Sequence, residues 1–275
     1  MTLRPYLLLV LIAASSHAIG HESGSAEYLG NEGVLVAHGD TRVLFDAFYA
    51  QSFGQYALLK EETVAALLAG TPPYDGIDAV FVSHVHGDHF TPGPTIAYLR
   101  AQPEVPLYGS SQIRAAIADV VGPEDPLLER VHVMDVGVGD AARRVSVGDL
   151  DIAAVAIPHA GGARRANIIN LAFRVTLDRT LTVLHLGDAD PAPRLYEPHA
   201  DHWREVTLDA AFPPYWFYGS PQGWEVVREH LRATATIGIH VPTSAIGRGD
   251  AVRSELGGDA FTDPGERRVL THGEG

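Results

Sequence analysis

Residues 78–90 read DAVFVSHVHGDHF, and they place several potential metal ligands directly behind a strand-like run. Residues 78–83 have the β-branched and aromatic composition of a buried strand. His84 and His86 follow, and side chains two positions apart in extended backbone point to the same face. Gly87 permits a sharp turn. Asp88 and His89 follow it, and their side chains are expected to point to a second position beside the one that His84 and His86 share. The motif therefore predicts a site for a pair of metal ions.

Three further candidate ligands lie far from this motif, and each follows another strand-like run. His159 follows DIAAVAIP, Asp188 follows TLTVLHLG and His240 follows TATIGI. Binding sites assemble at the carboxyl ends of strands in sheets built this way, so we expect these segments to meet at one edge. His185 and Asp190 are second choices near Asp188. Solvated loop residues are the alternative interpretation for each distant residue, since the chain has 14 histidines.

The remainder of the chain predicts a mixture of strands and helices in one α+β domain. A hairpin is expected at 34–46, with Gly39 and Asp40 as its turn. Helices are expected at 56–68, 95–101, 110–121, 223–232 and 247–256. Strands are expected at 106–108, 131–136, 141–147, 150–157, 168–175, 181–186 and 234–239. This pattern suggests two sheets packed face to face with helices outside.

Residues 1–18 are expected to be an export signal, followed by one domain at 19–275. Arg4 precedes an apolar run at 6–14, and small residues flank His17 as a cleavage site. A buried first strand or helix is the alternative. The apolar run is too short to span a bilayer. The chain has no cysteine, and hence no disulfide, thiolate ligand or lipid anchor, so we expect a periplasmic or secreted protein without a membrane anchor.

The charge of the chain argues against a nucleic-acid partner. The net charge is −14, and removal of residues 1–18 leaves 34 acidic against 19 basic residues, a net charge of −15. Nucleic-acid binding depends on neutralising phosphates with Lys and Arg. A small-molecule substrate is the expected partner, and the sequence carries no signal for an oligomeric state.

The motif resembles the HxHxDH signature of the metallo-β-lactamase superfamily, which is matched by His84, His86, Asp88 and His89. The order of the later ligands is also similar to that of the family. The resemblance implies a four-layer αββα sandwich with a binuclear metal site. It implies that His84, His86 and His159 hold the first metal. It implies that Asp88, His89 and His240 hold the second, with Asp188 bridging both.

Two positions separate the chain from other branches of that superfamily. Asp188 departs from the true β-lactamases, which lack this carboxylate, and His86 departs from the diiron oxygen-reducing branch, which has Glu there. The chain is more similar to the ascorbate-phosphate-lactonase-like hydrolases. Zinc is the first expectation for the two divalent metals, with manganese and iron as alternatives, because imidazole and carboxylate ligands suit all three.

The predicted function is that of a binuclear metal-dependent hydrolase. A metal-bridging hydroxide would attack a small ester, lactone or phosphoester. Asp88 and Asp188 are the expected catalytic residues, because they would orient the hydroxide as well as bind metal. The alternatives are a metallo-β-lactamase acting on β-lactams and a non-catalytic periplasmic metal-binding protein.

Candidate substrate-binding residues come from two segments near the expected site. Arg164 and Arg165 closely follow His159 and would clamp an anionic group, or else form a solvated loop pair. Tyr215 belongs to an aromatic segment at 212–218 that would line a pocket, or else pack between helix and sheet. Asp46 lies at the end of the hairpin. Its carboxylate is expected to accept a hydrogen bond from the N–H of a metal-binding histidine, or else to accept hydrogen bonds from backbone N–H groups in a turn.

Overall fold

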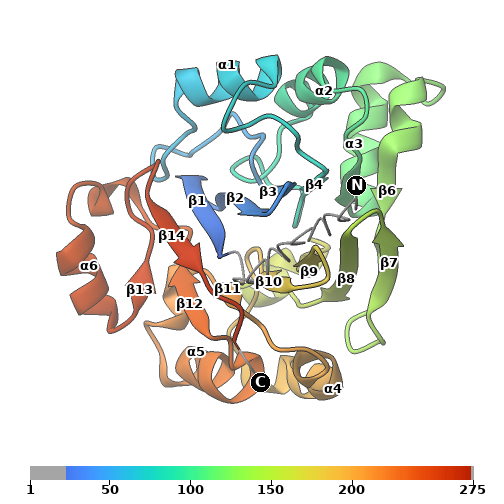
Figure 1. Cartoon of the computed structure of the whole chain (residues 1–275). Helices are drawn as coiled ribbons and strands as arrows, with labels where there is room; N and C mark the ends of the chain where they lie inside the picture. The colour runs from blue at the N-terminus through green and yellow to red at the C-terminus, as the bar shows by residue number, and fades with distance from the viewer. Residues whose placement is uncertain (1–22, 274–275) are drawn as a thin grey trace, which may run out of the picture.

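The computed structural model describes residues 23–273, and it consists of two facing β-sheets with helices on both outer sides (Figure 1). The expected α+β four-layer sandwich is confirmed. The export signal expected at 1–18 lies outside the described residues. Within residues 23–273, no helix combines the length and the apolar composition needed to cross a membrane.

The first sheet has seven strands in the order β14-β1-β2-β3-β4-β5-β6. Neighbours from β14 to β3 pair antiparallel, and those from β3 to β6 pair parallel. Its strands are β1 (Gly24–Gly30), β2 (Gly33–His38), β3 (Thr41–Phe45), β4 (Ala79–Phe81), β5 (Leu107–Gly109), β6 (Val131–Val133) and β14 (Arg267–Leu270).

The second sheet also has seven strands, in the order β13-β12-β11-β10-β9-β8-β7. Strands β7 to β10 are antiparallel, whereas β10 to β13 are parallel. Its strands are β7 (Arg143–Val147), β8 (Leu150–Ala156), β9 (Leu171–Leu177), β10 (Leu181–His185), β11 (Ala210–Phe212), β12 (Ala235–Gly238) and β13 (Asp259–Ala260).

Helices cover the outer face of each sheet and one edge (Figure 1). Helices α1 (Glu61–Ala69), α2 (Pro92–Ala101) and α3 (Ser111–Val121) pack on the first sheet. Helices α4 (Ala200–Arg204) and α5 (Pro221–Glu225) pack on the second, and α5 continues as a π-helical segment, η6 (Val226–Leu231). Helix α6 (Gly249–Leu256) lies beside β13.

The strands are apolar on both faces because each face meets a different layer. In β4, Ala79 and Phe81 point between the sheets, whereas Val80 points to the helices of the first sheet. Across the interface, Phe173 of β9 packs on Phe81 with ring centroids 5.2 Å apart. Ala172, the residue next to Phe173 in β9, points to the opposite face of the sheet, which α4 and α5 cover. Burial on both faces explains why these strands lack a polar alternation.

Several predicted boundaries differ from the structure. The helix expected at 56–68 begins only at Glu61, because the preceding residues are extended and Tyr56 forms an isolated bridge with Pro242. The strand expected at 168–175 is displaced to Leu171–Leu177. Strand β1 was not predicted, and its Gly and Glu residues explain why, since they are uncommon in strands. The three-residue β11 was missed as well.

The topology brings the carboxyl ends of the ligand-bearing strands to one edge of the sandwich. Strands β3 and β4 are parallel neighbours in the first sheet, as are β10, β11 and β12 in the second. Strand β8 runs in the same direction as β10, because both are antiparallel to β9. Within each sheet these strands end on the same side, and the ligand groups formed by the loops after β4, β8, β10 and β12 show that the two sides coincide.

The inter-sheet core predicts a large cost for removing Phe173. The Phe173→Ala variant should lose about 3–5 kcal/mol of unfolding free energy, because a fully buried ring is replaced by a cavity. Urea denaturation followed by circular dichroism measures this loss. The control is Val269→Ala on edge strand β14, where the side chain is 71% exposed and the change should stay within about 0.5 kcal/mol. Equal effects of both variants would contradict this description of the core.

Candidate metal centre

The first group of ligand atoms contains three imidazoles and one carboxylate, all within 4.8 Å of one another. His84 Nε2 lies 3.0 Å from His86 Nδ1, and His159 Nε2 lies 3.0 Å from the same atom. Asp188 Oδ2 lies 3.1 Å from His159 Nε2 and 3.9 Å from His84 Nε2. Tetrahedral zinc ligands at 2.0–2.1 Å stand about 3.3 Å apart, so this spacing suits one cation.

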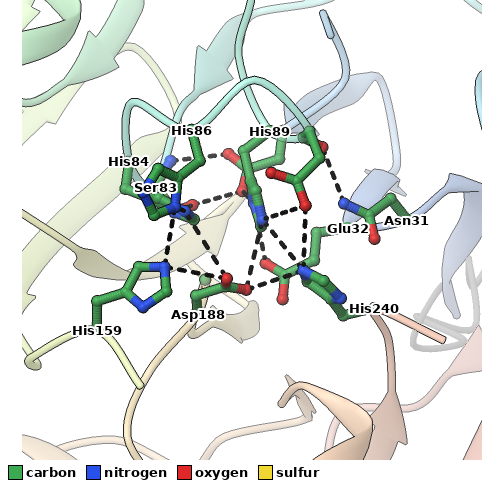
Figure 2. Close-up of polar contacts among 12 residues, drawn as sticks. Asn31, Glu32, Ser83, His84, His86, His89, His159, Asp188 and His240 are labelled. Atoms are coloured by element: carbon green, nitrogen blue, oxygen red, sulfur yellow. Dashed lines mark hydrogen bonds and ion pairs between the residues drawn. The ribbon is translucent and has the colours of Figure 1, made fainter. Parts of the chain in front are cut away.

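The second group contains Asp88, His89 and His240. His89 Nε2 and His240 Nε2 are 3.3 Å apart, and Asp88 Oδ2 lies 3.6 Å from His240 Nε2. Asp188 Oδ1 completes this group at 3.1 Å from His240 Nε2 and 3.4 Å from His89 Nε2. The two oxygens of Asp188 therefore face two different histidine groups (Figure 2).

Hydrogen bonds around the centre turn the lone pairs of three imidazoles inward. His89 Nδ1 donates to Asp46 Oδ2 at 2.9 Å, and His159 Nδ1 donates to the Ala160 carbonyl at 2.6 Å. His84 Nδ1 lies 3.0 Å from Ser83 Oγ, whose own hydroxyl donates to Asp46. Each imidazole thus carries its proton on the outer nitrogen and presents Nε2 to the centre, which is the arrangement that metal-binding histidines need.

Asp46 fulfils both roles that the sequence left open for it. Besides accepting from His89, its carboxylate accepts the backbone N–H of Ser83 at 2.7 Å and the Ser83 hydroxyl at 2.5 Å. Asp46 follows β3 and Ser83 follows β4, so these bonds hold two adjacent strand ends together. The position of the HxHxDH loop depends on this carboxylate.

Asn170 holds the ligand loops of the second sheet in register. Its Nδ2 donates to the carbonyls of Ile157 and Leu186, and its Oδ1 accepts the N–H of Asp188 at 3.1 Å. Gly187 is required beside it, since a Cβ there would clash with Asn170 and with Ser83 of the opposite sheet, and its φ is +54°. The Gly-Asp step therefore places Asp188 at a point where segments of the two sheets are in direct contact.

The electrostatics of the centre favour cations. Burial lowers the pKa of His86 to about 4, helped by His159 and Arg165, so this imidazole is neutral at pH 7. Burial likewise lowers the pKa of His84. Burial opposes protonation of His89 as well, but the carboxylates of Asp188, Glu32 and Asp46 outweigh it and raise its pKa. Negative charge is thus concentrated around the second group.

The donor set fits two divalent cations. His86 Nδ1 lies 3.0 Å from both His84 Nε2 and His159 Nε2, and a single proton on it can be donated to only one of them, whereas one cation can bind all three nitrogens. Asp188 Oδ1 is buried and accepts no hydrogen bond, although it faces two histidines. Imidazole and carboxylate are the usual ligands of zinc, manganese and iron. Residues 84, 86, 159 and 188 would hold one cation, and residues 88, 89, 240 and 188 the other.

The second choices near Asp188 are engaged elsewhere. His185 donates from Nε2 to the Glu32 carbonyl at 3.0 Å and accepts from the Gly187 N–H at Nδ1. Both of its nitrogens are therefore satisfied by backbone groups. Asp190 accepts the N–H of Ala192 at 3.0 Å and does not belong to a ligand group among the described residues.

An open cleft of 620 Å³ gives access to the centre. Arg164 and Arg165, both exposed, line it together with Asp188, His159, His240, Tyr56 and Trp216. Arg165 Nη1 lies 3.3 Å from His86 Nε2. Tyr215, the expected aromatic residue, packs against the inter-sheet core instead, and its neighbour Trp216 faces the cleft.

Sequence reasoning missed several residues around the centre, among them Ser83, Asn170, Tyr56 and Trp216. Ser83 and Asn170 act by hydrogen bonds to distant segments, for which a linear pattern carries no signal. Tyr56 was assigned to a helix, although it lies edge-on to His240 with ring centroids 4.2 Å apart. The aromatic run at 212–218 did signal a cleft wall, but not which ring forms it.

The fold and the ligand cluster define a class of metallo-hydrolase-like proteins, and sequence comparison agrees with it. The model of the "Beta-lactamase superfamily domain" family matches residues 41–240, which contain all seven predicted metal ligands. The chain belongs to this family. No curated protein matches the chain in sequence. The ascorbate-phosphate-lactonase-like branch stays a prediction, because the match is to the superfamily as a whole.

Solved structures share the fold at low sequence identity. Igni18, a metallo hydrolase from the archaeon Ignicoccus hospitalis, is 13% identical with a TM-score of 0.57, covering 91% of this chain and 100% of its own. An isothiocyanate hydrolase from Delia radicum gut bacteria is 14% identical with a TM-score of 0.57, covering 90% and 100%. CmlA, a diiron β-hydroxylase from Streptomyces venezuelae, is 19% identical with a TM-score of 0.53, covering 90% and 54%.

These likenesses establish the metallo-β-lactamase fold. The family match places the chain in the β-lactamase superfamily, and its histidine and aspartate side chains form groups that could hold metal ions.

Metal removal is predicted to destabilise the protein. A ligand present at 100 times its Kd contributes about 2.7 kcal/mol, and each kcal/mol moves Tm by about 2–4 °C in a domain of this size. Chelation with EDTA should therefore lower Tm by about 5–10 °C in differential scanning fluorimetry, and added zinc or manganese should restore it. A Tm that does not respond to either treatment would contradict the proposed ligand set.

Proposed function

We propose that this chain is an exported binuclear metal-dependent hydrolase that acts on a small ester, lactone or phosphoester carrying an anionic group. The observation that supports it most directly is the position of Asp188, whose Oδ2 faces His159 and whose Oδ1 faces His240. A single carboxylate between two imidazole groups is the arrangement that a pair of cations needs. Export is proposed from the sequence of residues 1–18 alone.

A pair of divalent cations, when bound, ionises a water near neutral pH and polarises the scissile group of a substrate. The side chains of the protein orient the attacking water and hold the imidazole ligands in place. Asp88 and Asp188 offer carboxylate oxygens that accept hydrogen bonds from the attacking water and fix its orientation. Imidazoles His84 and His159 are held by Ser83 and the Ala160 carbonyl, so the centre does not need to reorganise during the reaction.

Arg165 is the proposed contact for the anionic group of the substrate. Its guanidinium now lies against His86 Nε2. When His86 uses Nδ1 as a ligand, its proton must reside on Nε2, and this nitrogen can no longer accept from a guanidinium, which is only a donor. Arg165 is then available to an anion in the cleft. Arg164 reinforces the positive charge at the same mouth.

Tyr56 is proposed as a hydrogen-bond donor to the substrate. Burial raises its pKa to about 12, and the nearby carboxylates Asp188 and Asp88 contribute, so the phenol keeps its proton at neutral pH. It lines the cleft beside His240. So weak an acid donates a hydrogen bond to a developing oxyanion better than it transfers a proton. Trp216 supplies an apolar wall next to it.

Zinc is proposed for the first position, because three of its four ligands are imidazoles. At that position His84, His86 and His159 are joined by a single carboxylate oxygen of Asp188. The second position has a larger share of oxygen ligands, and manganese or iron are the alternatives there.

Loss of Asp188 is predicted to abolish both metal pairing and hydrolysis. Purified protein should contain about two metal ions per chain by elemental analysis and hydrolyse members of a panel of lactones, carboxylesters and phosphoesters. The Asp188→Ala variant should retain at most one ion and lose at least about 10²-fold in kcat/KM, since it removes a ligand of both positions. Asp190→Asn, two residues away and outside the ligand groups, is the matched control and should behave as wild type.

The same panel separates the alternatives. Rapid turnover of a chromogenic cephalosporin with little activity elsewhere would favour a β-lactamase. Two bound ions with no turnover of any substrate would favour a metal-binding protein without catalysis. Full activity in Asp188→Ala would refute the proposed centre.

The Arg165→Ala variant is predicted to raise KM selectively for anionic substrates. Removal of a charge-assisted hydrogen bond of about 1.5–3 kcal/mol corresponds to about 10–100-fold in KM, whereas neutral esters should change little. Arg100→Ala, on the outer surface of α2, is the control for a general change in charge. An equal increase in KM for neutral and anionic substrates would argue against the contact.

A further inference from the structure

Glu32 is a fully buried carboxylate beneath the metal centre that neither the sequence nor the known ligand pattern uses. It lies in the turn between β1 and β2 and has no exposed surface. Figure 2 shows its carboxylate beside Asp188 and His240. One of its oxygens, an Asp188 oxygen and a His240 nitrogen all lie within 4.8 Å of one another.

Hydrogen bonds attach the turn that carries Glu32 to three segments of the centre. Asn31 Nδ2 donates to the carbonyl of Asp88 at 2.8 Å, and the His240 N–H donates to the Asn31 carbonyl at 2.8 Å. His185 Nε2 donates to the backbone carbonyl of Glu32 at 3.0 Å. The backbone of Glu32 is therefore fixed relative to the ligands, and its side chain has little freedom to turn away.

The carboxylate itself has no hydrogen-bond donor. Neither Oε1 nor Oε2 accepts a hydrogen bond. The imidazoles near Oε2 are His89, whose Nδ1 is 3.6 Å away, and His185, whose Nε2 is 3.8 Å away. Both N–H groups are already used, by Asp46 and by the Glu32 carbonyl. A buried carboxylate without a partner is strongly unfavourable unless it is neutralised or binds a cation.

The surrounding charges make the need for a cation greater. Glu32 shares one ligand group with Asp46 and another with Asp188, and Asp88 approaches the same His240. Two divalent cations would balance these four carboxylates.

We propose that Glu32 is a further carboxylate ligand of the second cation, which it reaches from the buried side of the centre. The inference rests on the two-cation centre proposed above. It gives the second position two imidazoles, His89 and His240, and three carboxylates, Asp88, Asp188 and Glu32. The first position keeps three imidazoles and one carboxylate.

The two positions would consequently prefer different metals. Oxygen-rich sites favour manganese and iron relative to sites rich in imidazole. Glu32 would thus add a hard oxygen ligand to the second position. The resulting centre would bind zinc at the first position and manganese or iron at the second.

The test is a metal titration of Glu32→Gln, which keeps the shape of the side chain and removes its charge. Metal-free full-length protein is titrated with Mn²⁺ by isothermal calorimetry. Wild type should bind two ions. The variant should bind the first with unchanged affinity and the second about 10–100-fold more weakly, and the electron paramagnetic resonance spectrum should change from spin-coupled to mononuclear manganese. Glu32→Asp should recover part of the second affinity.

Glu27→Gln is the matched control. Glu27 is also a buried carboxylate near the same strand end, but it accepts from Tyr74 at 2.7 Å and pairs with Arg267 at 2.6 Å. It lies outside the ligand groups found among the described residues. Its replacement should leave both manganese affinities unchanged, although it removes two polar contacts.

The thermal stability of the metal-free protein separates a ligand from a merely structural residue. A ligand without hydrogen bonds contributes nothing to the metal-free fold, so Glu32→Gln should have an unchanged or higher Tm without metal and a smaller increase in Tm with it. A lower Tm without metal, or two manganese ions bound with wild-type affinity, would overturn the proposal. Wild type that binds fewer than two ions would refute the binuclear centre itself.

Discussion

The structure depends on the concentration of negative charge and imidazole lone pairs at one end of the sandwich. Asp188 faces both histidine groups, Asp46 fixes His89 and Ser83, and Asp88 and Glu32 add two more carboxylates. Such a cluster repels itself in a buried environment, and only positive charge relieves the repulsion. The two sheets are therefore joined at this edge by polar groups suited to binding cations, whereas their inner faces are joined by apolar packing.

The apolar packing and the polar edge have separate tasks. Between the sheets, rings such as Phe81 and Phe173 fill the space and exclude water, which fixes the distance between the two sets of strand ends. At the edge, Asn170 and Asp46 fix the positions of the ligand-bearing loops by hydrogen bonds to their backbone groups. The strand ends thus hold the ligands, and the loops that carry Arg165 and Tyr56 line the cleft. This division is common in enzymes, whose loops determine the substrate while the scaffold determines the chemistry.

Much of the centre was predictable because its ligands are encoded locally. The spacing of His84, His86, Asp88 and His89 after a strand is a short-range pattern, and His159, Asp188 and His240 each follow an apolar run. The fold class was likewise predictable, since strand-like and helix-like segments alternate along the chain. The failures include the weak strands β1, β11, β13 and β14 and the start of α1, where pairing and contacts with distant residues override the local pattern.

The sequence by itself determined the residue types and the strand ends from which the proposed two-metal centre is built, because side-chain chemistry and strand periodicity are local properties. Only the tertiary structure decided that Trp216 rather than Tyr215 faces the cleft, that His185 is engaged by backbone groups, and that Glu32 lies unpartnered beneath the ligands. These outcomes depend on which segments meet across two sheets. A carboxylate in the turn at residues 30–33 carries no sign of the histidine 208 positions away that it will approach.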